Sequence, residues 1–242
     1  CLNSIKKCGN EISLEVIVSD NASTDGSAWM VREKFPWVRL LTGKNVGFSK
    51  GNNRAKPYVK GDMVLFLNPD TAVRKNVFAR TIAYLRQHPG VGALTCKLVL
   101  PSGKIDKDAR RRFPTPWISF MRLFLGNGKK YWYEDVDPNR IQEVDAIQGA
   151  FFLTRKSILD KVGWFDEDYF FDGEDVDLCF QINKAGYKLV YYPDTHITHL
   201  KGVTKGKVAK WKYKVTPAQR KKLRLAGVAS MERFFRKNLW QN

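Results

Sequence analysis

Short runs of apolar residues alternate along the chain with longer stretches in which apolar residues recur at helical spacing. The clearest run, residues 63–67, reads Met-Val-Leu-Phe-Leu without a polar position. An unbroken run of this length is typical of a strand that is buried on both faces of a mostly parallel sheet. Because Pro69 has no N–H group to donate to a sheet, we expect the strand to end before Asn68-Pro69-Asp70.

The other runs extend this pattern. We expect strands at residues 14–19, 38–41, 63–67, 91–95, 144–154 and 187–192, and helices at about 75–87, 155–161, 173–186 and 216–237. Strands that alternate with helices at short spacing indicate βαβ units and an α/β fold with a mostly parallel sheet. The irregular stretch 97–140 is expected either to be an insertion over the carboxyl edge of the sheet or to be a solvated loop with an aromatic patch on the core.

Composition and charge divide the chain into two parts. The 242 residues are 43% hydrophobic, which is enough for a sizeable core, and the net charge is +18. Thirteen lysines and arginines lie from Lys201 onward, against Glu232 as the single acid. We therefore expect a domain over residues 1–204 and a basic, amphipathic helical extension over 205–242. Such charge favours anionic partners: lipid headgroups, phosphates or nucleic acid.

Two features concern the compartment. No stretch approaches the roughly 20 consecutive apolar residues that span a bilayer, and we expect no signal peptide. The four cysteines are scattered and include no Cys-x-x-Cys pair. We expect a reducing compartment, without a disulfide framework or a zinc site.

Polar turns follow several of the predicted strands. Asp70 lies beyond the carboxyl end of its strand, where open α/β sheets bind ligands, although a turn aspartate that caps the next helix explains it equally well. Small polar residues fill positions 20–27, and glycines and amides fill 45–53. Neither stretch is a dinucleotide fingerprint or a P-loop, so each is a weak signal alone.

Acidic residues are densest at the start of the predicted helix at about 173–186. Four of them lie within six positions: Asp172, Glu174, Asp175 and Asp177. The helix dipole stabilises an acid in the first turn by about 0.3–1 kcal/mol, and Asp172 could be the N-cap. Because four acids also repel one another, a functional role is favoured over a purely structural helix start.

Six motifs, taken in order, resemble the inverting glycosyltransferases of family 2, which have the GT-A fold, and most closely their rhamnosyltransferase-like bacterial members. The motifs span about residues 14–204 and read Ser-Asp-Asn-Ala-Ser-Thr-Asp-Gly-Ser at 19–27, Asn-Val-Gly-Phe at 45–48 with Gly-Asn-Asn at 51–53, Leu-Asn-Pro-Asp at 67–70, Gly-Ala-Phe-Phe at 149–152, Gly-Glu-Asp-Val-Asp at 173–177, and His199 with Gly202 and Thr204. Asn68 stands where the family has the first acid of its Asp-x-Asp motif. The family's first strand would precede Cys1 and is expected upstream.

The resemblance implies a function and a role for each matching residue. The implied reaction moves a sugar such as rhamnose from a nucleotide-diphosphate sugar donor to a hydroxyl of a glycan or lipid-linked acceptor, in cell-surface polysaccharide synthesis. Asp70 and His199 would bind Mg²⁺ or Mn²⁺, and Asp175, with Glu174 beside it, would be the general base. The donor would be bound by Asp20, Asn45, Gly47, Asn52, Asn68 and Gly149.

The basic extension has two explanations. Thr216-Pro217-Ala218-Gln219 is a capping box, and an apolar face follows it at Val228, Met231, Phe234, Phe235 and Leu239. This face either packs on the catalytic domain or lies on an anionic membrane surface near a lipid-linked acceptor. The second explanation predicts a cytoplasmic protein that is peripheral on the inner face of the cell membrane.

Two other function classes remain open. A nucleotidyltransferase of nucleotide-sugar synthesis would share the α/β sheet and the metal, but it usually has a glycine-rich basic loop, which is not visible here. The charge would also permit nucleic-acid binding. However, Glu174, Asp175 and Asp177 in a cleft would repel phosphates unless a metal intervened, so we expect no nucleic-acid partner.

Overall fold

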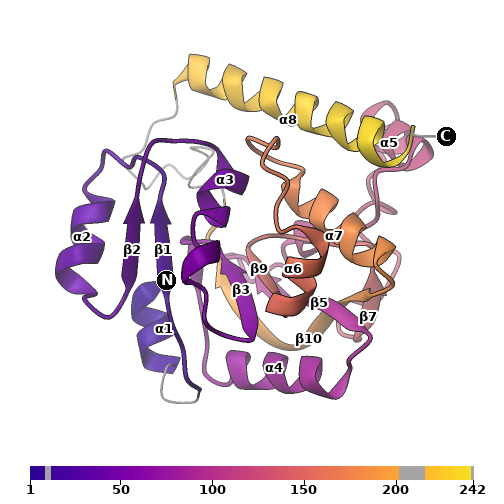
Figure 1. Ribbon diagram of the computed structural model, residues 1–242. Helices are drawn as coiled ribbons and strands as arrows, with labels where there is room; N and C mark the ends of the chain where they lie inside the picture. Colours follow the sequence, from indigo (N-terminus) through magenta and orange to yellow (C-terminus); the bar gives the residue numbers. More distant parts are fainter. Residues whose placement is uncertain (9–11, 202–215, 241–242) are drawn as a thin grey trace.

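The computed structural model describes residues 1–8, 12–201 and 216–240, and the statements below concern these residues (Figure 1). The central sheet has six strands in the order β3–β9–β5–β10–β4, with β7 also paired to β10; β1 with β2 and β6 with β8 form two-stranded sheets. The strands are β1 (Ile17–Asp20), β2 (Arg39–Thr42), β3 (Met63–Leu67), β4 (Thr71–Ala72), β5 (Val91–Val99), β6 (Arg110–Arg111), β7 (Gln142–Val144), β8 (Ala146–Ile147), β9 (Phe151–Arg155) and β10 (Lys188–His199).

Helices cover the central sheet. Figure 1 shows α4 on one side of it and α6 and α7 on the other, with α8 crossing above them. The α-helices are α1 (Leu2–Cys8), α2 (Ser27–Lys34), α3 (Phe48–Asn53), α4 (Val77–Gln87), α5 (Pro116–Leu123), α6 (Lys156–Val162), α7 (Glu174–Lys184) and α8 (Pro217–Asn238), and 3₁₀ helices lie at Lys56–Tyr58 and Lys107–Ala109. The predicted α/β fold is confirmed. Strands β3 and β5 are both antiparallel to β9, and β10 is parallel to β5. Strands β3, β5 and β10 therefore point the same way.

Strand β3 has the predicted bounds but not the predicted surroundings. It pairs antiparallel with β9, and only Val64 and Phe66 are buried, whereas the alternate residues are half-buried. The expectation of a strand buried on both faces was therefore wrong. The reason is a cavity of about 1840 Å³ that reaches both β3 and β1. In the described part of the chain no strand lies between β1 and β3. The strand that was expected upstream of Cys1 stays a prediction.

Two other strand predictions needed correction. The apolar stretch 144–154 is divided into β7, β8 and β9, with a turn at Gly149 and Ala150 between β8 and β9. The predicted strand at 187–192 continues as β10 to His199, because its register to β5 shifts between Tyr192 and His196 and pairing then resumes. His199 is thus a strand residue, seven positions beyond the predicted end of the strand.

The last turns of α8 pack on the preceding part of the chain. Phe234 is fully buried and belongs to the main hydrophobic core, where its ring contacts those of Phe113 and Phe180. Lys237 forms ion pairs with Asp166 and Asp177, at 2.8 Å each. In this half of the helix the packing alternative therefore holds, while the division at residues 204 and 205 stays a prediction.

Replacing Phe234 with alanine tests this packing. Loss of a fully buried aromatic side chain is expected to lower the free energy of unfolding by about 3–5 kcal/mol, measured by denaturant titration. Val228→Ala is the matched control, because Val228 lies on the same helix and is 62% exposed; its effect should stay within about 0.5 kcal/mol. Equal effects of the two substitutions would show that α8 does not pack in solution as described.

Other features bear on the compartment. All four cysteines are free thiols, and three of them are buried. Among the described helices, none combines the length and the apolar character that crossing a membrane requires.

Candidate active site

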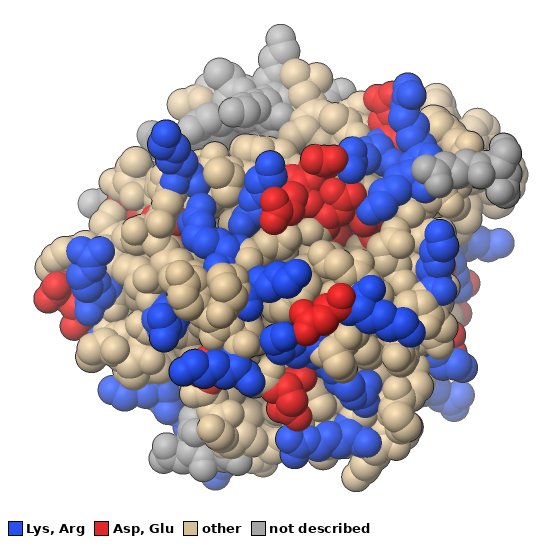
Figure 2. Space-filling view, viewed as in Figure 1, with Lys and Arg blue, Asp and Glu red and all other residues tan. Residues whose placement is uncertain are grey.

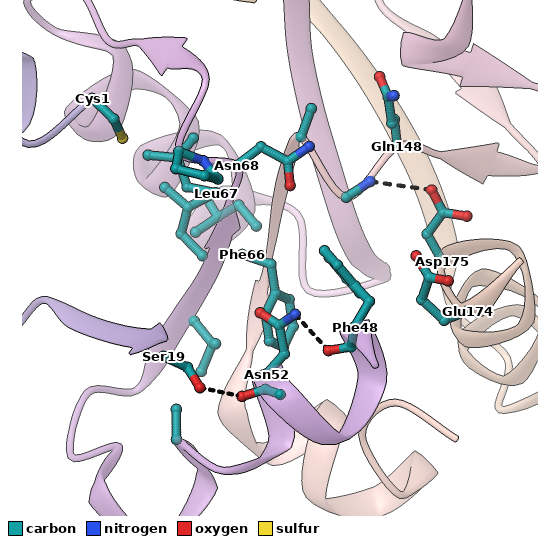
Figure 3. Close-up of a pocket in the computed structure, with 18 of the residues that line it drawn as sticks. Cys1, Ser19, Phe48, Asn52, Phe66, Leu67, Asn68, Gln148, Glu174 and Asp175 are labelled. Carbon is teal, nitrogen blue, oxygen red and sulfur yellow. Dashed lines mark hydrogen bonds between the residues drawn. The ribbon is translucent and has the colours of Figure 1, made fainter. Parts of the chain in front are cut away.

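One cavity collects most of the residues that the sequence singled out (Figure 3). It lies among β1, β3 and the start of α7. The predicted site residues that line it are Asp20, Asn52, Asn68, Asp70, Gly149, Glu174, Asp175 and His199. Asn45 and Gly47 are not among its lining residues. Residues from six separate parts of the sequence thus share one space.

Strand pairing brings Asp70 to His199. The short strand β4 pairs antiparallel with the end of β10, with Thr71 opposite His199. The N–H group of Leu200 donates to the carbonyl oxygen of Asp70 at 2.8 Å, and this bond holds the backbone of Asp70 beside the end of β10. The Asp70 carboxylate consequently lies 3.4 Å from His199 Nε2.

A second carboxylate holds the His199 ring from behind. Asp106 Oδ2 lies 2.8 Å from His199 Nδ1, and the Asp106 side chain is fully buried. Lys201 Nζ forms ion pairs with Asp106 and, at 2.6 Å, with Asp108. Burial lowers the pKa of His199, but the hydrogen bonds to Asp106 and Asp70 outweigh it and raise this pKa to about 9. The contact of Nδ1 with Asp106 fixes the ring so that Nε2 is directed at Asp70.

This pair fits a divalent cation. A carboxylate oxygen and an imidazole nitrogen that is oriented by a second carboxylate are common metal ligands, and a bound cation would take the place of the proton on His199 Nε2. Within the described ranges no group of three or more histidine, cysteine or acidic side chains could hold a metal ion. Asp70 and His199 would therefore supply two ligands and leave the other positions to phosphate oxygens and water, as Mg²⁺ sites often do.

Asn45 and Gly47 shape the loop beside the cavity. Asn45 Oδ1 accepts the N–H group of Gly47 at 3.1 Å, and Gly47 has a φ of 89°. A Cβ atom at Gly47 would come within 2.6 Å of the Phe170 carbonyl oxygen, so only glycine fits there. Asn21, which the sequence analysis did not select, donates from Nδ2 to the Gly47 carbonyl at 2.7 Å. This bond ties the loop to the end of β1.

Asp175 is held by a buried arginine. Arg111 Nη2 lies 2.7 Å from Asp175 Oδ2, and both side chains are about 10% exposed. The same carboxylate oxygen accepts the N–H group of Gly149 at 3.2 Å (Figure 3). Arg111 belongs to β6, whose antiparallel pairing with β8 places Arg111 opposite Ala146. The irregular stretch 97–140 thus contributes a charged residue to the site.

Glu174 differs from its neighbour in charge. Figure 3 shows the two acids side by side at the start of α7. Burial, together with the nearby Asp175 charge, raises the pKa of Glu174 to about 8. Glu174 Oε2 is buried and has no hydrogen-bond partner within the described structure. The raised pKa favours the protonated form of Glu174 at neutral pH, while Asp175 is ion-paired with Arg111.

Asp177 has a structural role. Its side chain is 2% exposed, and it accepts hydrogen bonds from Lys237 Nζ and Asn238 Nδ2, each at 2.8 Å. Both partners belong to the last turns of α8. The acidic cluster is thus tolerated because Asp175 faces Arg111, Asp177 faces α8, and Glu174 holds its proton.

Curated relatives match most of the chain. It is 31% identical over 217 residues to an N-acetylglucosaminyl-diphospho-decaprenol L-rhamnosyltransferase of Mycobacterium tuberculosis, covering 81% of this chain and 70% of the relative. It is 30% identical over 193 residues to rhamnosyltransferase WbbL of Escherichia coli K12, covering 76% of this chain and 72% of the relative.

Solved structures share the GT-A fold at lower sequence identity. The mannosyltransferase PcManGT of Pyrobaculum calidifontis, in complex with GDP-Man and Mn²⁺, superposes with a TM-score of 0.54 at 20% identity, over 96% of this chain and 61% of that one. GalNAc-T7 with UDP, GalNAc and Mn²⁺ superposes with a TM-score of 0.62 at 15% identity, over 98% of this chain and 47% of that one. The family model described as "Glycosyltransferase like family 2" matches residues 1–220. The chain therefore belongs to the family 2 glycosyltransferases.

Proposed function

We propose that this glycosyltransferase moves a sugar, with rhamnose the first candidate, from a nucleotide-diphosphate donor to a hydroxyl of a lipid-linked glycan, with inversion at the anomeric carbon. The observation that carries the proposal is that one cavity holds both the Asp70–His199 pair and the Glu174–Asp175 pair. The names of the curated relatives support the sugar and the lipid-linked diphosphate acceptor.

Asp70 and His199 would hold Mg²⁺ or Mn²⁺ at the donor diphosphate. Two of the structural relatives are complexes that contain Mn²⁺. A bound cation would neutralise the charge that develops on the leaving diphosphate. Asn68 offers an amide at the position of the first acid, so it would contribute a hydrogen bond without adding negative charge. Asp20, Asn52 and Gly149 would line the rest of the donor site.

Asp175 would take the proton of the acceptor hydroxyl. Arg111 and the Gly149 N–H group hold its carboxylate in one orientation, which is what a general base requires. Because Glu174 is mainly neutral, the hydroxyl approaches one negative charge rather than two. Attack from the face opposite the leaving diphosphate inverts the anomeric configuration.

The test is a panel of nucleotide-diphosphate sugars, each incubated with Mn²⁺ and a lipid-linked N-acetylglucosaminyl diphosphate acceptor. Release of nucleoside diphosphate and an inverted product anomer, seen by NMR, are expected with one donor. Absence of transfer from every donor would contradict the proposal. Release of pyrophosphate from a nucleoside triphosphate and a sugar phosphate would instead identify a nucleotidyltransferase.

The proposed setting is the cytoplasmic face of the cell membrane, where a peripheral enzyme would meet a lipid-linked acceptor. The sequence analysis gave membrane contact as one of two explanations for the apolar face of this helix. Phe234 of that face is buried in the core, so this half of the helix does not offer an apolar face to lipid.

A further inference from the structure

Four large apolar side chains form an exposed ridge along and just beyond α5, which we call the α5 ridge. Its members and their exposed fractions are Trp117 (62%), Phe120 (44%), Phe124 (76%) and Leu125 (59%). The spacing of the three aromatic residues places them on one side of the helix. Their rings are stacked, with centroids 5.9 Å apart for Trp117 and Phe120 and 5.4 Å apart for Phe120 and Phe124. A contiguous exposed apolar surface of this kind usually marks an interaction site.

The ridge is mounted on a fixed support. Thr115 caps the helix by accepting the N–H group of Ile118 at 3.3 Å, and Pro116 occupies the first turn. On the protein side, the Arg122 guanidinium lies 4.3 Å from the ring centroid of Tyr131, which is buried. The helix is thus held from beneath while its aromatic side faces solvent.

The support of the ridge also borders the active site. Pro114, Ser119 and Arg122 line the same cavity as Asp175. Arg111, which holds Asp175, lies five residues before Pro116. A surface bound by the ridge would therefore lie next to the mouth of the catalytic cavity.

Charge beside the ridge identifies the kind of surface. Lys129 and Lys130 are exposed and follow the last residue of the ridge after three intervening positions. Phe234, near the end of α8, stacks on Phe113, which lies three residues before α5, and the exposed Trp240 lies just beyond the end of α8. Figure 2 shows that lysine and arginine outnumber acidic side chains on the face it presents, in keeping with the net charge of +18. Exposed aromatic residues beside basic ones suit an anionic bilayer, where the rings enter the interface and the cations meet the headgroups.

We propose that the α5 ridge inserts into the interface of an anionic lipid bilayer and holds the mouth of the catalytic cavity against the membrane. The lipid contact is argued from the ridge and its charges alone. Only its purpose, delivery of a lipid-linked acceptor, rests on the proposed function.

Vesicle binding tests the ridge. The full chain should sediment with phosphatidylcholine vesicles that contain phosphatidylglycerol, and binding should weaken by at least about tenfold without the anionic lipid, since each basic residue near the surface contributes about 1 kcal/mol. The triple substitution Trp117→Ser, Phe120→Ser, Phe124→Ser should remove most of the binding. Trp29→Ser is the matched control, because Trp29 is 61% exposed on α2 and should leave binding unchanged. Lys129→Glu with Lys130→Glu should weaken binding to the anionic vesicles.

Three outcomes would overturn the proposal: no binding of the unmodified chain, unchanged binding of the triple variant, or equal loss in the Trp29 control. A dimer in light scattering that the triple variant abolishes, without vesicle binding, would assign the ridge to self-association. Circular dichroism checks that the variants fold.

Transfer to a short-chain soluble acceptor should survive the triple substitution, whereas transfer to acceptor in vesicles should fall. Failure of all transfer would contradict the proposed function and leave the vesicle result intact.

Discussion

Replacing Asp175 with asparagine is expected to lower the turnover number for glycosyl transfer by about 10²–10⁴-fold, the usual contribution of a general base. The amide keeps the shape of the carboxylate but cannot take a proton. Donor affinity, measured by titration calorimetry, should change little, because the assigned role is towards the acceptor. Glu174→Gln should have the smaller effect on turnover, since Glu174 is mainly protonated at neutral pH.

The buried arginine must be controlled in this experiment. Asp175→Asn leaves Arg111 without its counter-charge, and breaking a buried ion pair costs on the order of 3–5 kcal/mol of stability. The double substitution Arg111→Met, Asp175→Asn removes both charges and should recover much of that stability without recovering turnover. Asp177→Asn should lower stability more than turnover, because its partners are on α8. Near-normal turnover in Asp175→Asn, together with a large loss in Glu174→Gln, would assign the base to Glu174.

Local chemistry explains which parts of the site were predictable. Pro69 ends β3 by its own backbone, so the position of Asp70 beyond the strand could be derived from neighbouring residues. The start of α7 at Glu174 is likewise close to the predicted start, because its acids and apolar spacing are local signals. The helix predicted at 216–237 is observed at Pro217–Asn238 for the same reason. Such features need no knowledge of distant segments.

Long-range pairing explains what was missed. Arg111 reaches Asp175 only because β6 pairs with β8, and its one sequence signal was a run of three arginines in an irregular stretch. Asp106 approaches His199 across 93 positions. The length of β10 depends on pairing that resumes after a shift in its register to β5, which no local periodicity encodes. The half-burial of β3 depends on a cavity between segments that are distant in sequence.

Removal of divalent cations is expected to abolish transfer, and Asp70→Ala should reduce it to a similar level. The loss should be about 10²-fold or more, because charge stabilisation by a bound metal is worth several kcal/mol. Asp62→Ala is the matched control: Asp62 precedes β3 at the end opposite Asp70, its side chain is 77% exposed, and its ion pair with Arg86 is exposed as well.

A readout that does not depend on turnover separates metal binding from chemistry. Mn²⁺ binding in the presence of nucleoside diphosphate, followed by electron paramagnetic resonance, should weaken in Asp70→Ala and in His199→Ala and stay unchanged in Asp62→Ala. Asp106→Asn should weaken it by about 10–100-fold, the usual effect of removing a carboxylate that orients a histidine ligand. The Asp106 result is the most discriminating, because Asp106 lies on the far side of the imidazole from Asp70 and would influence a metal at Nε2 through the ring. Full transfer in the presence of EDTA would remove the metal from the proposal, and the Asp70–His199 contact would then be a structural link between β4 and β10.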